Sequence, residues 1–177
     1  MSDYVRGEVT DELRAEFAGR GDASLPENAL VRLEVISLAP GRSRNFRLVV
    51  MDDGRVFYAR NAADGGGGAD DKVFNVPLPD EPNGTLPVEV VEEIRGMLDR
   101  SGFFGEAGYV ANERTRDGSV AIVAARKGAA VHEVWFWNAE NELTEYLHSL
   151  AAAQEDPKSY AEIVAQLKEL QERQGSE

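Results

Sequence analysis

Residues 61–72, NAADGGGGADDK, combine four consecutive glycines, Gly65–Gly68, with the carboxylates of Asp64, Asp70 and Asp71. A glycine-rich loop that binds phosphate needs a Lys and a Ser or Thr after its last glycine, and then a helix. Here an alanine and two aspartates follow instead, and carboxylates repel phosphate. A phosphate site and a nucleotide cofactor are therefore not expected.

The same segment also matches the first part of a calcium-binding nonapeptide repeat. The match is the run GGGGAD, but Lys72 stands where that repeat has a large apolar residue. Such sites share each ion between stacked repeats, and the chain holds one copy. We favour a flexible connection between two strands, with no metal bound, and keep calcium as the alternative.

Histidines, serines and cysteines give no recognisable catalytic pattern. His132 and His148 are the two histidines, and neither belongs to an H-E-x-x-H motif. No G-x-S-x-G motif is present, and without cysteine the chain has no thiolate chemistry, disulfides or cysteine-based zinc sites. We assign no catalytic residue, and an enzyme of unrecognised type is the third of our functional hypotheses.

The segment VHEVWFW, residues 131–137, is the strongest candidate for an interaction surface. Alternation along a strand places Trp135 and Trp137 on one face of a sheet. The preceding run SVAIVAAR is apolar on both faces, which predicts a hairpin covered on both sides. Terminal helices could supply the second cover; a protein partner or a second copy of the chain is the alternative. We expect the chain itself to bury Trp135, and Trp137 to be better placed to reach a partner.

The chain is strongly acidic. Its 177 residues hold 32 acidic and 19 Lys or Arg side chains, giving a net charge of −13 and a pI near 4.6. Nucleic acids and anionic lipids repel such a surface, so neither is an expected partner. No apolar run approaches the roughly 20 residues of a membrane span, and the N-terminus lacks the pattern of a signal peptide. These features predict a soluble cytoplasmic protein, and the acidity favours a basic protein partner.

The elements that must position these residues form an α+β pattern within one domain, residues 1–177. We expect an antiparallel sheet built from hairpins, with helices packed on it and extra helices at both termini. The alternation in 29–38 predicts a strand buried on one face only. Strands are predicted at 29–38, at 44–60 with a turn at Asp53-Gly54, at 72–79 and at 118–138; helices are predicted at 10–18, 85–102, 140–153 and 156–174.

Residues 30–150 form the core of this pattern, and they resemble a group of small bacterial α+β domains. The resemblance is carried by DGRVFYA, LPVEVVEEIRGMLDRSGFF, DGSVAIVAARKGAAVHEVWFWN and ELTEYLHSL. The group includes emfourin-type metalloprotease inhibitors and related uncharacterised domains. The resemblance implies an α+β fold and a binding protein; residues 1–29, the glycine-rich insertion and residues 156–177 are extra to it. It identifies neither a protease partner nor any inhibitory residue.

The sequence thus leads to two main hypotheses. The first is a non-catalytic, acidic protein-binding module, similar in role to an inhibitor or an immunity protein, whose interaction surface includes Trp135 and Trp137. The second is a stand-alone structural or self-associating domain, such as a homodimer, without a ligand.

Overall fold

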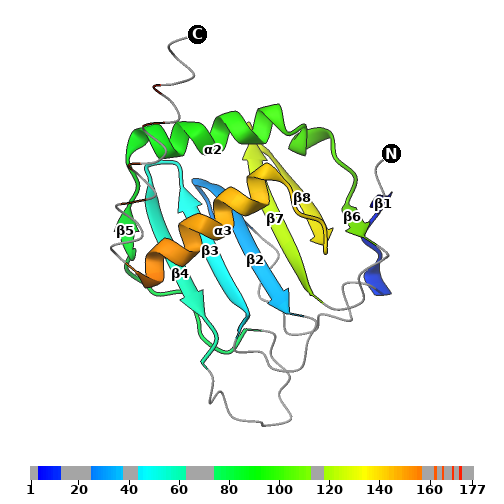
Figure 1. The fold of residues 1–177 in the computed structure, drawn as a ribbon, viewed down its shortest axis with the longest axis horizontal. Helices are drawn as coiled ribbons and strands as arrows, with labels where there is room; N and C mark the ends of the chain where they lie inside the picture. The colour runs from blue at the N-terminus through cyan, green and yellow to red at the C-terminus, as the bar shows by residue number, and fades with distance from the viewer. Residues whose placement is uncertain are drawn as a thin grey trace.

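The structure is a computed structural model that describes residues 4–12, 25–37, 44–62, 74–112 and 118–156, with the single residues 162, 165, 169 and 172. An eight-stranded sheet has the strand order β1-β6-β8-β7-β2-β3-β4-β5. Two helices lie on one face of this sheet (Figure 1). Every neighbouring pair is antiparallel except β6 and β8, which run parallel. The predicted α+β class and the mainly antiparallel sheet are confirmed.

Along the chain, five strands precede the first of the two helices on the sheet and three more precede the second. The strands are β1 (Tyr4–Gly7), β2 (Ala29–Ser37), β3 (Phe46–Met51), β4 (Arg55–Arg60), β5 (Gly84–Thr85), β6 (Tyr109–Asn112), β7 (Ser119–Lys127) and β8 (Ala130–Trp137). The helices are α2 (Val88–Arg100), the 3₁₀ turn η2 (Phe103–Gly105) and α3 (Glu142–Glu155). No helix in this described part of the chain is long and apolar enough to cross a membrane.

The pairing of β2 with β7 joins the two halves of the sheet. Their register sets Leu33 opposite Val123, and both side chains are completely buried in the main core. Alternate residues of the sheet face the helices, which supply the rest of that core. On α2 the buried stripe is Val90, Val91, Ile94, Met97 and Leu98, the spacing expected for one helical face.

The ends of the helices follow from local sequence. Helix α2 begins after Pro87, whose fixed φ suits a helix start, and it ends before Gly102, whose φ is +69°. Helix α3 begins with a capping box: the Asn141 side chain accepts a hydrogen bond from the Thr144 backbone at 2.9 Å, and the Asn141 backbone donates to the Thr144 hydroxyl at 3.0 Å.

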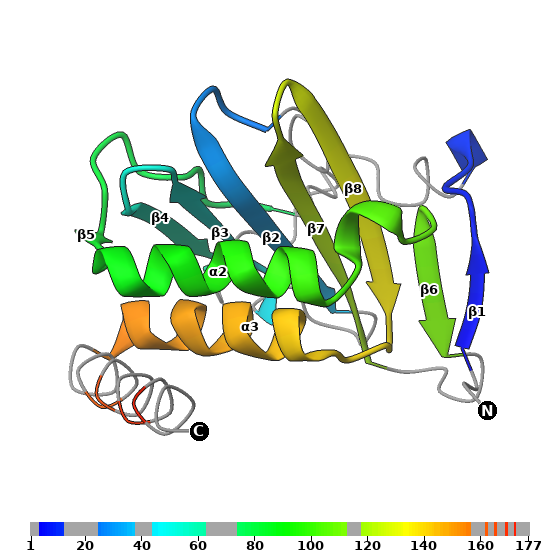
Figure 2. The ribbon, with the colours of Figure 1, turned by 90° about the horizontal axis from the view of Figure 1, so that it is seen from above.

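The helices are too short to cover the whole sheet. Helix α3 has 14 residues and is therefore about 21 Å long, whereas eight strands spaced about 4.8 Å apart span roughly 34 Å. Both helices lie across the strands between the β5 end of the sheet and β8; α2 runs towards β8 and α3 runs back from it (Figure 2). Strands β6 and β1 lie beyond them, so no described helix covers that end of the sheet.

The opposite face of the sheet, which we call the back face, carries buried charges. Arg32 and Glu34 lie on the face of strand 29–38 that was predicted to be exposed, but only 4% and 2% of their surfaces are exposed. Arg32 Nε lies 2.9 Å from Glu34 Oε1, and Arg32 Nη2 lies 3.3 Å from Glu133 Oε2. The prediction of a strand buried on one face was wrong, because ion pairing allows these charges to be covered.

The described cover of the back face comes from irregular segments. Phe74 packs in one apolar cluster with Trp135, and Leu25 packs in a second with Leu78 at its margin. The strand predicted at 72–79 is absent from 74–79, where Pro77 and Pro79 remove two hydrogen-bond donors.

The glycine run at 65–68 and most of the two predicted terminal helices lie outside the described residues. That the terminal helices cover the second face of the sheet therefore stays a prediction.

The buried pair gives a stability prediction. Glu34→Gln removes the nearer of the two carboxylates that pair with buried Arg32, and we expect the free energy of unfolding to fall by up to about 3–5 kcal/mol. Replacing both partners by apolar residues, Arg32→Met with Glu34→Leu, should recover part of that loss. Urea unfolding of the wild type and the two variants measures this, and a double variant no more stable than Glu34→Gln would contradict it.

Candidate functional site

Trp135 is a structural residue of the back face. Its side chain has 0% exposure and packs with Ile36, Val120 and Ile122. Its indole N–H donates to Glu133 Oε1 at 2.8 Å, which satisfies the one polar atom of the ring. No surface of Trp135 is left for a partner.

Trp137 lies at the margin of the same cluster and is partly buried. The sheet register places it in line with Ala111 on β6 and Val5 on β1. Val5 is 37% exposed, so the row runs from the buried cluster to the open edge of the sheet. Trp137 thus lies two strands in from that edge.

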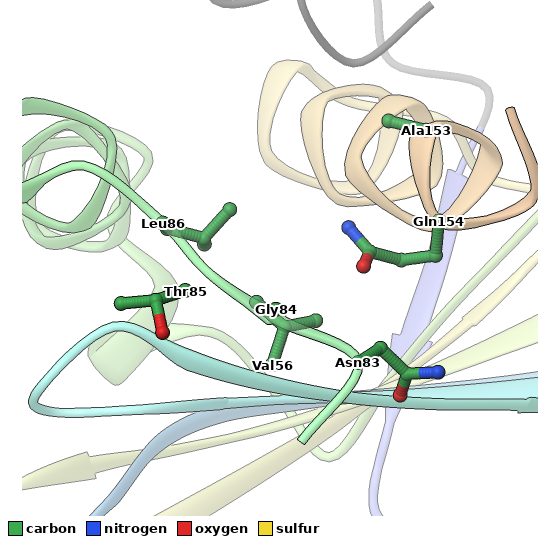
Figure 3. Close-up of a pocket in the computed structure, with 7 residues that line it drawn as sticks. All are labelled: Val56, Asn83, Gly84, Thr85, Leu86, Ala153 and Gln154. Carbon is green, nitrogen blue, oxygen red and sulfur yellow. The ribbon is translucent and has the colours of Figure 1, made fainter. Parts of the chain in front are cut away.

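The cavity between β5 and the end of α3 offers little chemistry. Its volume is about 150 Å³, and Gln154 of α3 points across it towards Gly84 (Figure 3). The Gln154 side-chain amide donates to the Leu150 carbonyl at 3.2 Å, which satisfies part of its polar group. No titratable side chain is among its lining residues, which are Val56, Asn83, Gly84, Thr85, Leu86, Ala153 and Gln154.

A larger depression lies at the other end of the sheet, where the helices stop. Two adjoining cavities, of about 400 and 220 Å³, share the residues Tyr4, Phe136, Ala139 and Glu140. We call them together the β1–α3 groove. The buried side chain of Phe136 belongs to its floor, and polar side chains from β1, β6 and α3 surround it. A combined volume of this order is typical of ligand-binding clefts.

A tight corner at the end of β8 sets the position of Glu140. Asn138 adopts a left-handed φ of +48°, and its side-chain oxygen accepts a hydrogen bond from the Ser119 backbone at 3.0 Å. Gly118 has a φ of +129°, and a Cβ there would lie 1.9 Å from the Asn138 side-chain oxygen, so only glycine fits. The capping box of α3 begins directly after Glu140. The backbone at Glu140, whose side chain is exposed, is therefore fixed between the corner at Asn138 and the capping box at Asn141.

The groove is electrostatically negative. Among the described residues no Lys or Arg pairs with Glu140, and the Arg6 guanidinium at the far end is already paired with Glu106 at 3.0 Å. Burial lowers the pKa of His148 from its ordinary value of 6.5, and the Glu140 carboxylate only partly opposes that shift. His148 is therefore neutral at pH 7, and the groove suits a cation.

A third cavity of about 500 Å³ lies at the end of β1. Its lining includes Gly7, Glu8 and Glu133. Arg6 and Glu106 line both this cavity and the groove, so their ion pair stands between the two. Strand β1 is thus bordered by hollow, mainly acidic surface.

Strand β1 itself is an edge strand with an open side. Among the described strands it pairs only with β6, and Tyr4 and Val5 are each 37% exposed. Backbone N–H and C=O groups on the outer side of an edge strand can pair with another chain. This combination of an open edge and an acidic groove is our candidate functional site.

Sequence reasoning missed most of this site. His148 was given no role by the sequence, yet it is partly buried in the groove, and its ring lies edge-on to that of Phe46 at 5.5 Å. Strand β1 was not predicted, because four residues are too few to show a period. Within the described residues, no group of three His, Asp or Glu side chains could hold a metal ion.

No family model, no curated protein and no solved structure matches this chain. The resemblance of residues 30–150 to emfourin-type domains therefore stays a prediction.

His148 gives a prediction on pH. Its pKa in the folded state is lowered, so between 6.5 and that lowered value the unfolded state binds more protons. The free energy of unfolding should accordingly fall as the pH drops below about 6.5. His148→Gln should make this fall shallower between pH 7 and 5, as measured by urea unfolding at each pH. Equal slopes in the two proteins would show that His148 titrates alike in both states.

Proposed function

We propose that the protein is a non-catalytic, acidic protein-binding module that takes up an extended, basic segment of a partner protein along the outer edge of β1. The single observation that carries the proposal is the open edge of β1 beside the acidic β1–α3 groove. Addition of a strand to a sheet edge is a common mode of peptide recognition, in which main-chain hydrogen bonds supply affinity. An inhibitor or an immunity-type protein would use its edge in this way.

Charge supports a basic partner. The protein carries a net charge of −13, and Glu8 and Glu140 line the cavities beside β1; Glu106 and Glu133 also line them but already pair with Arg6 and Arg32. A basic segment approaching this edge is attracted over a distance of about 8–10 Å at physiological salt, the Debye length. Electrostatic attraction of this kind raises association rates and selects among partners.

The same charge disfavours the alternative of a homodimer through β1. Pairing of two copies edge to edge would bring the Glu8 carboxylates, at the end of β1, and the acidic surfaces that include Glu140 towards each other. Within the described part of the chain, no base pairs with either carboxylate. Like charges across an interface cost energy, so a basic partner fits this edge better than a second copy.

The position of the tryptophans is consistent with this proposal in a modified form. Trp135 is buried and does not contribute, whereas Trp137 stands two strands behind the docking edge, in line with Val5. The interaction surface that we propose therefore includes Trp137 as its inner margin and β1 as its centre.

The proposal predicts protection of the backbone of β1 by a short extended peptide. A suitable probe is the acetylated and amidated peptide Lys-Thr-Val-Arg-Val-Thr-Lys, at up to about 1 mM because a four-residue edge supports only weak binding. We expect slower amide hydrogen exchange in residues 4–7, measured by NMR. The amides of Gly84 and Thr85, at the opposite edge of the sheet, are the control and should not change.

A peptide of the same composition with Glu in place of Lys and Arg should give no protection. Protection of β5 to the same extent as β1, or of neither edge, would contradict the proposal. A dimer in sedimentation experiments that buries β1 without any peptide would favour the self-associating alternative.

A further inference from the structure

Strand β1 presents two different faces to any strand that pairs with its edge. Tyr4 and Arg6 lie on the helix side, because both line the β1–α3 groove. Val5 and Gly7 lie on the back face, where Gly7 is opposite Tyr109. Side chains alternate along a strand, so an added strand must meet these two surfaces with alternate residues.

We propose that the partner segment carries one arginine or lysine opposite Tyr4, whose cationic group binds Glu140 in the groove, and an apolar residue at the adjacent position opposite Val5. This inference rests on the proposed function, because it takes the edge of β1 as the docking site. It adds the sequence pattern that the site selects.

The shape of the groove requires a long side chain. From the outer edge the groove passes Tyr4 on β1 and Asn112 on β6 before it reaches Glu140. An added strand lies three strand spacings of about 4.8 Å from β8, which is roughly 14 Å, so the partner's side chain and that of Glu140 must both extend into the groove. Lysine and arginine have the long stems that this reach requires, and their charged groups stay in polar surroundings. The stem or guanidinium can also lie over the Tyr4 ring, which attracts cations.

Charges in the groove favour a cation at Glu140 and disfavour a second one nearby. The positive end of the α3 dipole amounts to about half a charge, and the carboxylates of Glu140, Glu142 and Glu145 outweigh it. His148 adds no charge at pH 7, since burial lowers its pKa. Arg6 lies two residues along the same face of β1 and would repel a second base there. One basic residue, opposite Tyr4, is therefore expected.

The back face explains the apolar neighbour. Val5, Ala111 and Trp137 form one row across β1, β6 and β8. Ala111 is small, so the apolar surface continues from Val5 to the partly buried Trp137. An apolar residue next to Val5 would extend this row by one strand, as cross-strand apolar pairs do within a sheet.

A double-mutant cycle between peptide and protein tests the inference. The heptapeptide Lys-Thr-Val-Arg-Val-Thr-Lys is compared with a version that has citrulline, a neutral isostere, in place of arginine. Each is titrated into the wild-type protein and into Glu140→Gln, and the dissociation constant is followed by NMR chemical shifts. Glu145→Gln is the matched control, because it removes the same charge from the same helix without lining the groove.

We expect Glu140→Gln to weaken binding of the arginine peptide about tenfold, as for loss of one charge-assisted hydrogen bond. The citrulline peptide should bind the wild-type protein about as weakly, and Glu140→Gln should weaken it no further. Glu145→Gln should change neither constant by more than about twofold.

Additive losses, or equal effects of Glu140→Gln and Glu145→Gln, would overturn the inference. If residues 4–7 are still protected from hydrogen exchange in that case, the proposed function stands with a different specificity. If neither peptide protects residues 4–7, the proposed function itself fails.

Discussion

The width of the sheet relative to the length of its helices determines where this protein is covered and where it is open. Eight strands span roughly 34 Å, and helices of 13 and 14 residues span about 20 Å. Two helices crossing the strands can therefore complete a core over only part of the sheet. They cover the end that contains β2, β3 and β7, where the main core lies, and β6 and β1 extend past them (Figure 2). The groove, the open edge and the proposed docking site all follow from this mismatch.

The back face of the sheet is covered without any described helix, so its buried charges must be compensated locally. Buried Arg32 is compensated by Glu34 and Glu133, and the Arg47 guanidinium lies 4.8 Å over the ring of Phe74. Burial lowers the pKa of Arg47, while the Glu34 carboxylate opposes that shift. Irregular segments can cover such a surface, since they supply carbonyl groups as acceptors: Arg47 donates to the carbonyl of Val76. A purely apolar back face would expose a large hydrophobic patch, prone to aggregation, if these segments moved.

The sequence predicted the fold class and most central elements, because their signals are local and repeated. Helix α2 shows its apolar stripe, and Gly54 and Gly128 mark turns with positive φ. The pairing of Arg32 with Glu34 escaped prediction, because alternation of charged and apolar residues normally indicates a solvated face. The groove could not be predicted for a different reason: its residues come from β1, β6, β8 and α3, and only the order of strands in the sheet brings them together. Local periodicity and motifs do not reveal that order.

The central claim is that the uncovered edge of β1 accepts an extended basic strand. It is tested most directly by isotope-filtered NOE measurements between the unlabelled heptapeptide Lys-Thr-Val-Arg-Val-Thr-Lys and the labelled protein. The account predicts contacts between the peptide backbone and the backbone of residues 4–7, with the arginine side chain close to Tyr4 and Glu140. Contacts confined to the surface of α2 and α3, or to the β5 edge, would contradict it.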